Sequence, residues 1–213
     1  ARDNHTQSVK AWRKVEKGWY DKAAHSPQIY NVFSFDDTST YGPPHLTRRT
    51  PKGLTQARAE YIPFLIKDHA RGNLTYVYTP KGRYKKGANR LVTTLHASIK
   101  VLKEDMDHQA RHARTLVLIA DNFSENKNNT LFAYLQHLIQ EDVYDEIQLL
   151  FGPVGHTHNG IDQTHGTHNN DLGVFVLGDL AHLYSRYPAA WPNPATRPKA
   201  VLLDVMYNWD AFY

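Results

Sequence analysis

Apolar side chains along the chain change their spacing several times, and each spacing predicts a different element. Residues 9–24 place apolar and aromatic side chains three or four positions apart, which predicts an amphipathic helix. The segments 29–35, 61–66 and 74–78 are rich in β-branched and aromatic residues, which favours strands. The polar residues 68–73 separate the last two segments and therefore indicate an antiparallel hairpin.

The second half of the chain alternates between helical and strand-like spacing. Helical spacing recurs over residues 88–107 and 128–143, whereas residues 115–120 and 147–151 are continuous apolar runs, typical of strands buried on both faces. A further helix is expected within residues 162–187. Strand-helix-strand order favours parallel pairing. We therefore predict an α/β fold with a mixed five-stranded sheet, three antiparallel strands followed by two parallel strands, flanked by helices.

Composition supports one main domain with two appendages. The chain has 213 residues, of which 41% are hydrophobic, so it can bury a packed core. We expect a helical segment at 1–26, a main domain at 27–187 and a C-terminal extension at 188–213 that packs on it and holds a last apolar segment at 200–206. The chain contains no cysteine, which excludes disulfides and thiolate metal sites. No long apolar segment or secretion signal is readable, so we expect an intracellular protein without a membrane partner.

Charge is distributed unevenly along the chain. Residues 1–106 carry 19 basic and 9 acidic side chains, a net charge of +10, whereas residues 107–213 carry 6 and 12, a net charge of −6. This polarity fits a surface that attracts polyanions beside a site that gathers carboxylates. Two basic loops concentrate the cations that we expect to contact nucleic acid, Arg48, Arg49, Lys52, Lys81, Arg83, Lys85 and Lys86. The alternative is that these loops are only solvated.

Three carboxylates follow predicted strands. Asp36 and Asp121 come directly after apolar runs, and Asp162 comes at the end of the loop that follows the last run. Ligand sites in such sheets lie beyond the carboxyl ends of strands, and grouped carboxylates suit one or two Mg²⁺ or Mn²⁺ ions. Each aspartate alone could instead cap a helix or form a turn. Strand alternation places Asp36 and Asp37 on opposite faces and leaves either one as the first acid.

Other polar residues near these carboxylates are candidates for the same site. His156 can bind a metal, contact a phosphate or carry a proton, or it can simply shape its turn. Nearby His158 has the same chemistry, whereas His165 and His168 are expected on a helix surface. Asn126 and Lys127 follow a predicted strand, so they can orient a carboxylate and meet a phosphate. Their alternative role is helix capping.

Two segments of the chain resemble a known family. Residues 121–128 (DNFSENKN) and 151–162 (FGPVGHTHNGID) resemble eukaryotic, transposon-derived transposases of the RNase H-like, acidic-triad superfamily. An upstream strand ending in a lone aspartate matches residues 33–36. The resemblance implies an RNase H-like catalytic domain over residues 27–187, with Asp36, Asp121 and Asp162 as its catalytic and metal-binding acids. It favours Asp36 over Asp37 as the first acid.

The resemblance implies a metal-dependent nuclease or strand transferase that acts on nucleic acid phosphodiesters, uses two Mg²⁺ or Mn²⁺ ions and works in the nucleus. One alternative is a domesticated, inactive module in a larger assembly, which could meet a protein partner through the aromatic residues of its N- and C-terminal segments. Another is a metallophosphoesterase-like hydrolase, because residues 155–158 (GHTH) resemble a closing motif of that class. That class also needs a Gly-Asn-His segment, which does not precede residue 155. The sequence leaves DNA against RNA and the oligomeric state open.

Overall fold

The computed structural model describes residues 2–37, 61–82, 87–104, 113–122, 126–153, 199–203 and 205–212. Its elements, in chain order, are α1 (Arg2–His25), β1 (Tyr30–Asp37), β2 (Tyr61–Asp68), β3 (Leu74–Pro80), α2 (Ala88–Glu104), β4 (Thr115–Ala120), α3 (Asn129–Gln140), β5 (Glu146–Phe151), β6 (Lys199–Leu202) and α6 (Trp209–Phe212). The helix expected within residues 162–187 lies outside the described residues.

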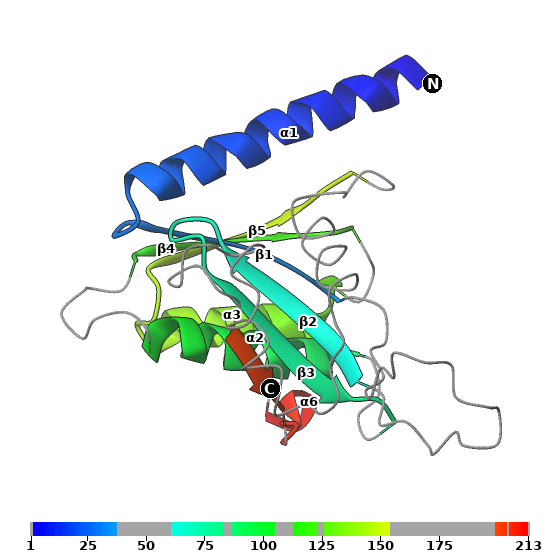
Figure 1. Ribbon diagram of the computed structural model, residues 1–213, viewed down its shortest axis with the longest axis vertical. Helices are drawn as coiled ribbons and strands as arrows, with labels where there is room; N and C mark the ends of the chain where they lie inside the picture. The colour runs from blue at the N-terminus through cyan, green and yellow to red at the C-terminus, as the bar shows by residue number, and fades with distance from the viewer. Residues whose placement is uncertain are drawn as a thin grey trace, which may run out of the picture.

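The strands form a single mixed sheet of six strands in the order β5-β4-β1-β2-β3-β6 (Figure 1). Strand β2 is antiparallel to β1 and β3, and β4 and β5 run parallel to β1. The predicted α/β class and this arrangement of three antiparallel and two parallel strands are confirmed. The expected number of five strands is wrong by one, because the C-terminal apolar segment pairs with β3 in parallel and becomes β6.

Two clusters of apolar side chains cover the two faces of the sheet. Helices α2 and α3 pack on one face, where Phe33 and Phe35 of β1 join the larger cluster. Helix α1 lies across the other face, where its residue Ala23 packs with Val32 of β1 (Figure 1). Strand side chains alternate between faces. Odd-numbered residues of β1 therefore face α2 and α3, and even-numbered residues face α1.

Helix boundaries differ from the periodicity mainly at polar ends. Helix α1 begins at Arg2 rather than at residue 9, because its first residues are polar and show no apolar spacing. Helix α3 begins after Asn128, whose side chain accepts a hydrogen bond from the backbone N–H of Leu131 at 2.7 Å. It ends at Gln140, and Asp142 follows with a positive φ of 53°. Among the described helices, none combines the length and apolar composition that a membrane span requires.

Candidate functional site

The first two predicted acids come from neighbouring parallel strands. Strands β1 and β4 pair in parallel, and their last recorded partners are Ser34 and Ile119. Continuing this register by two residues brings Asp36 level with Asp121. Neighbouring strands lie about 4.8 Å apart, so from this register we infer that the two aspartates are neighbours at the carboxyl end of the parallel half of the sheet. Both residues are partly exposed.

Strand alternation assigns the two carboxylates to the same face. Val117 and Ile119 of β4 pack in the cluster under α1, and Asp121 continues that alternation. Asp36 follows Val32 and Ser34 on the α1 face of β1. Asp37 points the other way, because its carboxylate forms an ion pair with Arg90 of α2.

Arg90 holds Asp37 with both terminal nitrogens of its guanidinium group. The Arg90 side chain is only 3% exposed, so the pair is largely shielded from water. The pair anchors the end of β1 to the first turn of α2, one residue from Asp36. Sequence reasoning missed Arg90, because a single arginine in an amphipathic helix carries no signal of its partner.

The described residues 122, 126 and 127 follow β4 and make contacts beside Asp121. Asn126 donates a hydrogen bond from its amide nitrogen to Asp121 Oδ1, which orients this carboxylate. Lys127 is exposed, and its ammonium group donates to Asn122 Oδ1. The same ammonium group lies 4.8 Å from the ring centroid of Phe151, the last residue of β5. The cation therefore stands at the carboxyl ends of β4 and β5.

A buried polar group lies behind Asp36 on the α1 face. Ser34 Oγ lies 2.5 Å from His69 Nε2, and the His69 ring stacks on Tyr20 of α1 at a centroid distance of 3.6 Å. Burial and the nearby charge of Lys67 lower the pKa of His69 to about 3. Burial also lowers the pKa of Lys67, which is the register partner of Ser34. This group couples α1 to β1, two residues before the carboxylate.

The structure places only part of the remaining predicted site. Lys81 is exposed directly after β3, whose carboxyl end lies at the same edge of the sheet as that of β1. Lys81 is not close to Asp36, because the registers bring Asp36 level with Tyr76 of β3, two strand spacings or roughly 10 Å away, and Lys81 lies five residues farther along. The other predicted residues lie outside the described residues: Asp162, His156, Arg48, Arg49, Arg83, Lys85 and Lys86.

The donors in the described part fit a hard cation but do not complete a site. Among the residues that the structure describes, no three histidine or carboxylate side chains are arranged to hold a metal ion. Asp36 and Asp121 supply carboxylate oxygens, which Mg²⁺ and Mn²⁺ prefer. Asp162 and His156, the expected further ligands, lie outside the described residues.

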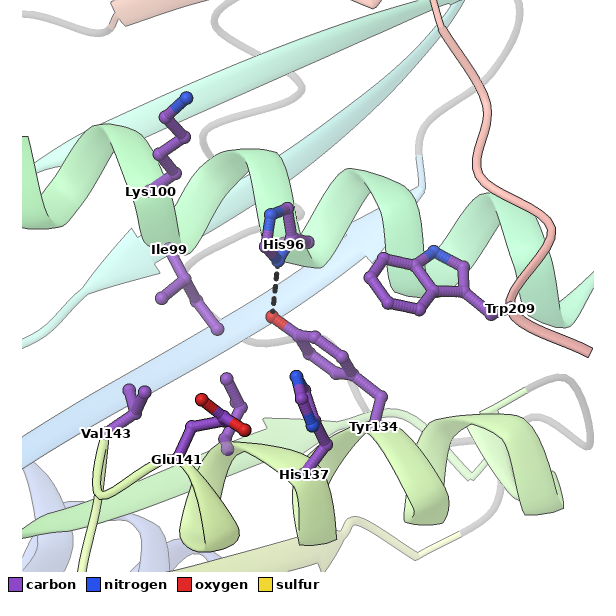
Figure 2. A pocket seen from close by; sticks show the side chains of 9 residues that line it. His96, Ile99, Lys100, Tyr134, His137, Glu141, Val143 and Trp209 are labelled. Atoms are coloured by element: carbon purple, nitrogen blue, oxygen red, sulfur yellow. Dashed lines mark hydrogen bonds between the residues drawn. The ribbon is translucent and has the colours of Figure 1, made fainter. Parts of the chain in front are cut away.

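A cavity of about 250 Å³ lies between α2, α3 and α6, on the other side of the sheet. Figure 2 shows His96 and Tyr134 facing each other, with His96 Nδ1 3.2 Å from the tyrosine hydroxyl, and Trp209 at one end. The lining is mostly apolar and aromatic. Because α2 and α3 cover the face opposite to Asp36 and Asp121, this cavity is separate from the carboxylate pair.

Comparison with solved structures supports the fold. A chain from a pre-cleavage Mos1 transpososome is 11% identical, with a TM-score of 0.50, and the match covers 87% of this chain and 54% of that chain. A chain of the Mos1 strand transfer complex is 9% identical, with a TM-score of 0.47, and the match covers 87% and 55%. The present chain thus spans about half the length of the Mos1 chains. At such identities the similarity concerns the fold alone, an RNase H-like mixed sheet flanked by helices.

The sequence comparisons give a family but no activity. A search among curated proteins finds no match. Residues 65–211, which run from the middle of β2 into α6, match a family whose description is "Domain of unknown function (DUF7869)". The match covers more than half of the chain, and the chain belongs to this family.

Proposed function

We propose that the chain is a transposase-derived, metal-dependent nuclease or strand-transferase domain that acts on nucleic acid phosphodiesters in the nucleus. One observation carries the proposal: the parallel register of β1 and β4, continued two residues beyond Ser34 and Ile119, brings Asp36 level with Asp121, and strand alternation assigns both to the α1 face. The fold similarity to a chain of a pre-cleavage transpososome supports nucleic acid as the partner.

The proposed site assigns a role to each acid. Asp36 and Asp121 would hold two Mg²⁺ or Mn²⁺ ions between the ends of β1 and β4, and Asp162 would complete the set, with His156 as a further ligand. When bound, such ions lower the pKa of an attacking water and stabilise the charge on the leaving oxygen. Asn126 keeps the Asp121 carboxylate in one orientation through the hydrogen bond to Oδ1.

Exposed cations at the same edge of the sheet would position the substrate. Lys127 stands at the ends of β4 and β5 and Lys81 at the end of β3, both exposed at the edge of the sheet that carries the carboxylates. Phosphate contacts of this kind fix the register of a nucleic acid without reading its sequence. The predicted basic loops, with Arg48, Arg49, Arg83, Lys85 and Lys86, would extend this surface.

The test combines metal binding with cleavage. Titration calorimetry with Mn²⁺ compares the native chain with Asp36→Asn and Asp121→Asn, and labelled DNA and RNA report cleavage in parallel. Asparagine at 121 keeps an oxygen that can accept from Asn126, so the fold is retained while a charge is lost. Asp145→Asn is the matched control, because Asp145 is 60% exposed and, within the described residues, forms an ion pair with exposed Arg114.

We expect both site variants to lose metal binding and to lose cleavage by at least about a hundredfold, while Asp145→Asn keeps both. Metal binding without cleavage of either polymer would favour a domesticated, inactive domain. Absence of both in the native chain, or variants that cleave like the native chain, would contradict the proposal.

A further inference from the structure

Helix α1 has a charged side that neither the sequence motifs nor the proposed site uses. Its apolar side packs on the sheet through Trp12, Trp19, Tyr20 and Ala23. A separate stripe of cations runs along the helix, spaced by three, one and three residues: Lys10, Arg13, Lys14 and Lys17. At 3.6 residues per turn this spacing puts all four on one side of the helix, beside the packed side.

The four stripe residues are available to a ligand. All four side chains are exposed. None forms an ion pair with another residue of the described chain. At a rise of 1.5 Å per residue, the stripe from Lys10 to Lys17 is about 10.5 Å long. Four positive charges over this length form a concentrated surface for a polyanion.

The stripe lies on the side of the sheet that carries the carboxylates. Figure 1 shows α1 running across one face of the sheet from the start of β1. This is the face to which alternation assigns Asp36 and Asp121, through the cluster of Val32, Val117 and Ile119. A polymer bound along the stripe therefore passes on the same side as the proposed site.

The packing of α1 distinguishes a polyanion from a membrane. A helix that lies in a membrane interface inserts its apolar side into the lipid. The apolar side of α1 is already occupied by the sheet, and Val15 alone is a large apolar side chain exposed on the described part of this helix. The exposed surface offers charge without an apolar side, which fits a phosphate backbone.

We propose that the stripe of Lys10, Arg13, Lys14 and Lys17 binds the phosphate backbone of double-stranded DNA and holds it against the face that carries Asp36 and Asp121. The choice of a nucleic acid rests on the proposed function, and the choice of duplex DNA rests on its charges, which lie about twice as close along the axis as those of one strand. B-form DNA carries one phosphate charge per about 1.7 Å of its axis, so a stripe of this length can meet several phosphates. Such contacts supply affinity without sequence specificity.

The salt dependence of DNA binding tests the stripe directly. Fluorescence anisotropy measures binding of a labelled 20-base-pair duplex at several salt concentrations, with EDTA present so that no divalent ion takes part. The stripe variant is Lys10→Gln, Lys14→Gln and Lys17→Gln, and the control variant is Lys22→Gln, Lys100→Gln and Arg114→Gln. The control removes the same charge from exposed positions outside the stripe. Glutamine and lysine have similar helix propensities, so α1 is retained, which circular dichroism checks.

Each lost phosphate contact lowers the slope of log affinity against log salt by about 0.9. We therefore expect the stripe variant to lose roughly 2.7 from this slope and the control variant to keep it. Equal slopes for the two variants would overturn the proposal. The same holds if the native chain fails to bind the duplex, or binds single-stranded RNA or anionic vesicles more tightly than the duplex.

The outcome is separate from that of the proposed chemistry. Asp121→Asn should bind the duplex at least as well as the native chain, because the mutation removes a negative charge and the assay contains no metal. If the stripe variant loses salt dependence but the native chain never cleaves, the DNA-binding proposal stands and the nuclease proposal is contradicted. If the native chain cleaves but the stripe variant keeps the native salt dependence, the nuclease proposal stands and the DNA-binding proposal is contradicted.

Discussion

His69 occupies a site that favours its neutral form. Burial and the charge of Lys67 lower the pKa of its imidazole to about 3, and the ring is held between Ser34 and Tyr20. In the unfolded chain the same imidazole has a pKa near 6.5. Between these two values the unfolded state binds a proton that the folded state does not. Acid therefore favours unfolding over this interval. Above about pH 6.5 the imidazole is neutral in both states and no longer lowers the free energy of unfolding.

We predict that the free energy of unfolding falls by up to about 1.4 kcal/mol per pH unit between about pH 6.5 and 3 because of this residue. Urea unfolding at pH 7 and pH 5 measures the effect. In His69→Gln the difference between the two pH values should shrink by up to about 2 kcal/mol. An equal pH effect in native chain and His69→Gln would contradict the assignment.

The pair of Asp37 and Arg90 gives a second prediction at the level of single residues. Removing one partner of a buried ion pair costs about 3–5 kcal/mol, because the remaining charge is left without compensation. Arg90 is 3% exposed, so Asp37→Asn should destabilise the fold by about 3 kcal/mol. The double variant Asp37→Asn, Arg90→Met should lose less than the sum of the single variants. Additive losses in urea unfolding would show that the two side chains are not coupled.

The choice between Asp36 and Asp37 shows what the sequence could not decide. Alternation along β1 predicts that the two side chains lie on opposite faces, which the Arg90 contact of Asp37 agrees with. Which face is covered by which helix depends on packing between segments far apart in the chain. The family resemblance favoured Asp36. Strand alternation assigns Asp36 to the α1 face of the sheet, which is also the face that alternation assigns to Asp121.

Element boundaries followed the periodicity best in strands with a continuous apolar run, whereas the helix expected over residues 128–143 ends at Gln140. Strand β4 was predicted at its observed bounds, because a continuous apolar run ends abruptly at Asp121. The hairpin of β2 and β3 was expected from its polar connection. Strand β6 was not expected, because it has only four residues and forms a strand by pairing with β3, which lies more than a hundred residues earlier. The first turns of α1 also lacked a signal, since they are polar.

The start of α3 depends on one side chain, which gives a prediction for this element. Asn128 Oδ1 accepts from the backbone N–H of Leu131, one of the N–H groups without a partner in the helix. Asn128→Ala should therefore cost about 1 kcal/mol of unfolding free energy, and Asn128→Asp, which keeps the acceptor, should cost little. Urea unfolding followed by circular dichroism compares them. Equal losses in both variants would mean that the cap is not what Asn128 contributes.

At the level of the whole molecule, the two ends of the chain meet different sides of the sheet. Helix α1 covers the face of the carboxylate pair, whereas β6 and α6 extend the edge and the opposite face. The sequence predicted the mixed sheet and the position of two acids at strand ends, because both follow from local pattern and connection order. It could not predict where the charged side of α1 would point, because that depends on how the helix packs.

Trp209 is the main anchor of the C-terminal segment and provides a test of its contribution to the whole fold. Its ring is 9% exposed, lies 5.3 Å from that of Tyr134, and its Nε1 donates to Thr93 Oγ1 at 2.9 Å. Since the segment also supplies β6, we expect α6 and the sheet to unfold together. Trp209→Ala should lower the free energy of unfolding by about 3–5 kcal/mol. The whole unfolding transition seen by far-ultraviolet circular dichroism should then shift to a lower urea concentration.

Two further variants separate packing from the hydrogen bond and from exposure. Trp209→Phe keeps an aromatic ring and loses the hydrogen bond to Thr93. Its cost in unfolding free energy should therefore be clearly smaller than that of Trp209→Ala and should equal about one hydrogen bond plus a small cavity. Phe212→Ala changes a side chain that is 66% exposed and should shift the midpoint little. If Trp209→Ala left the midpoint of the sheet unchanged, the C-terminal segment would unfold independently, and its pairing with β3 would contribute nothing to the stability of the strands that carry Asp36 and Asp121.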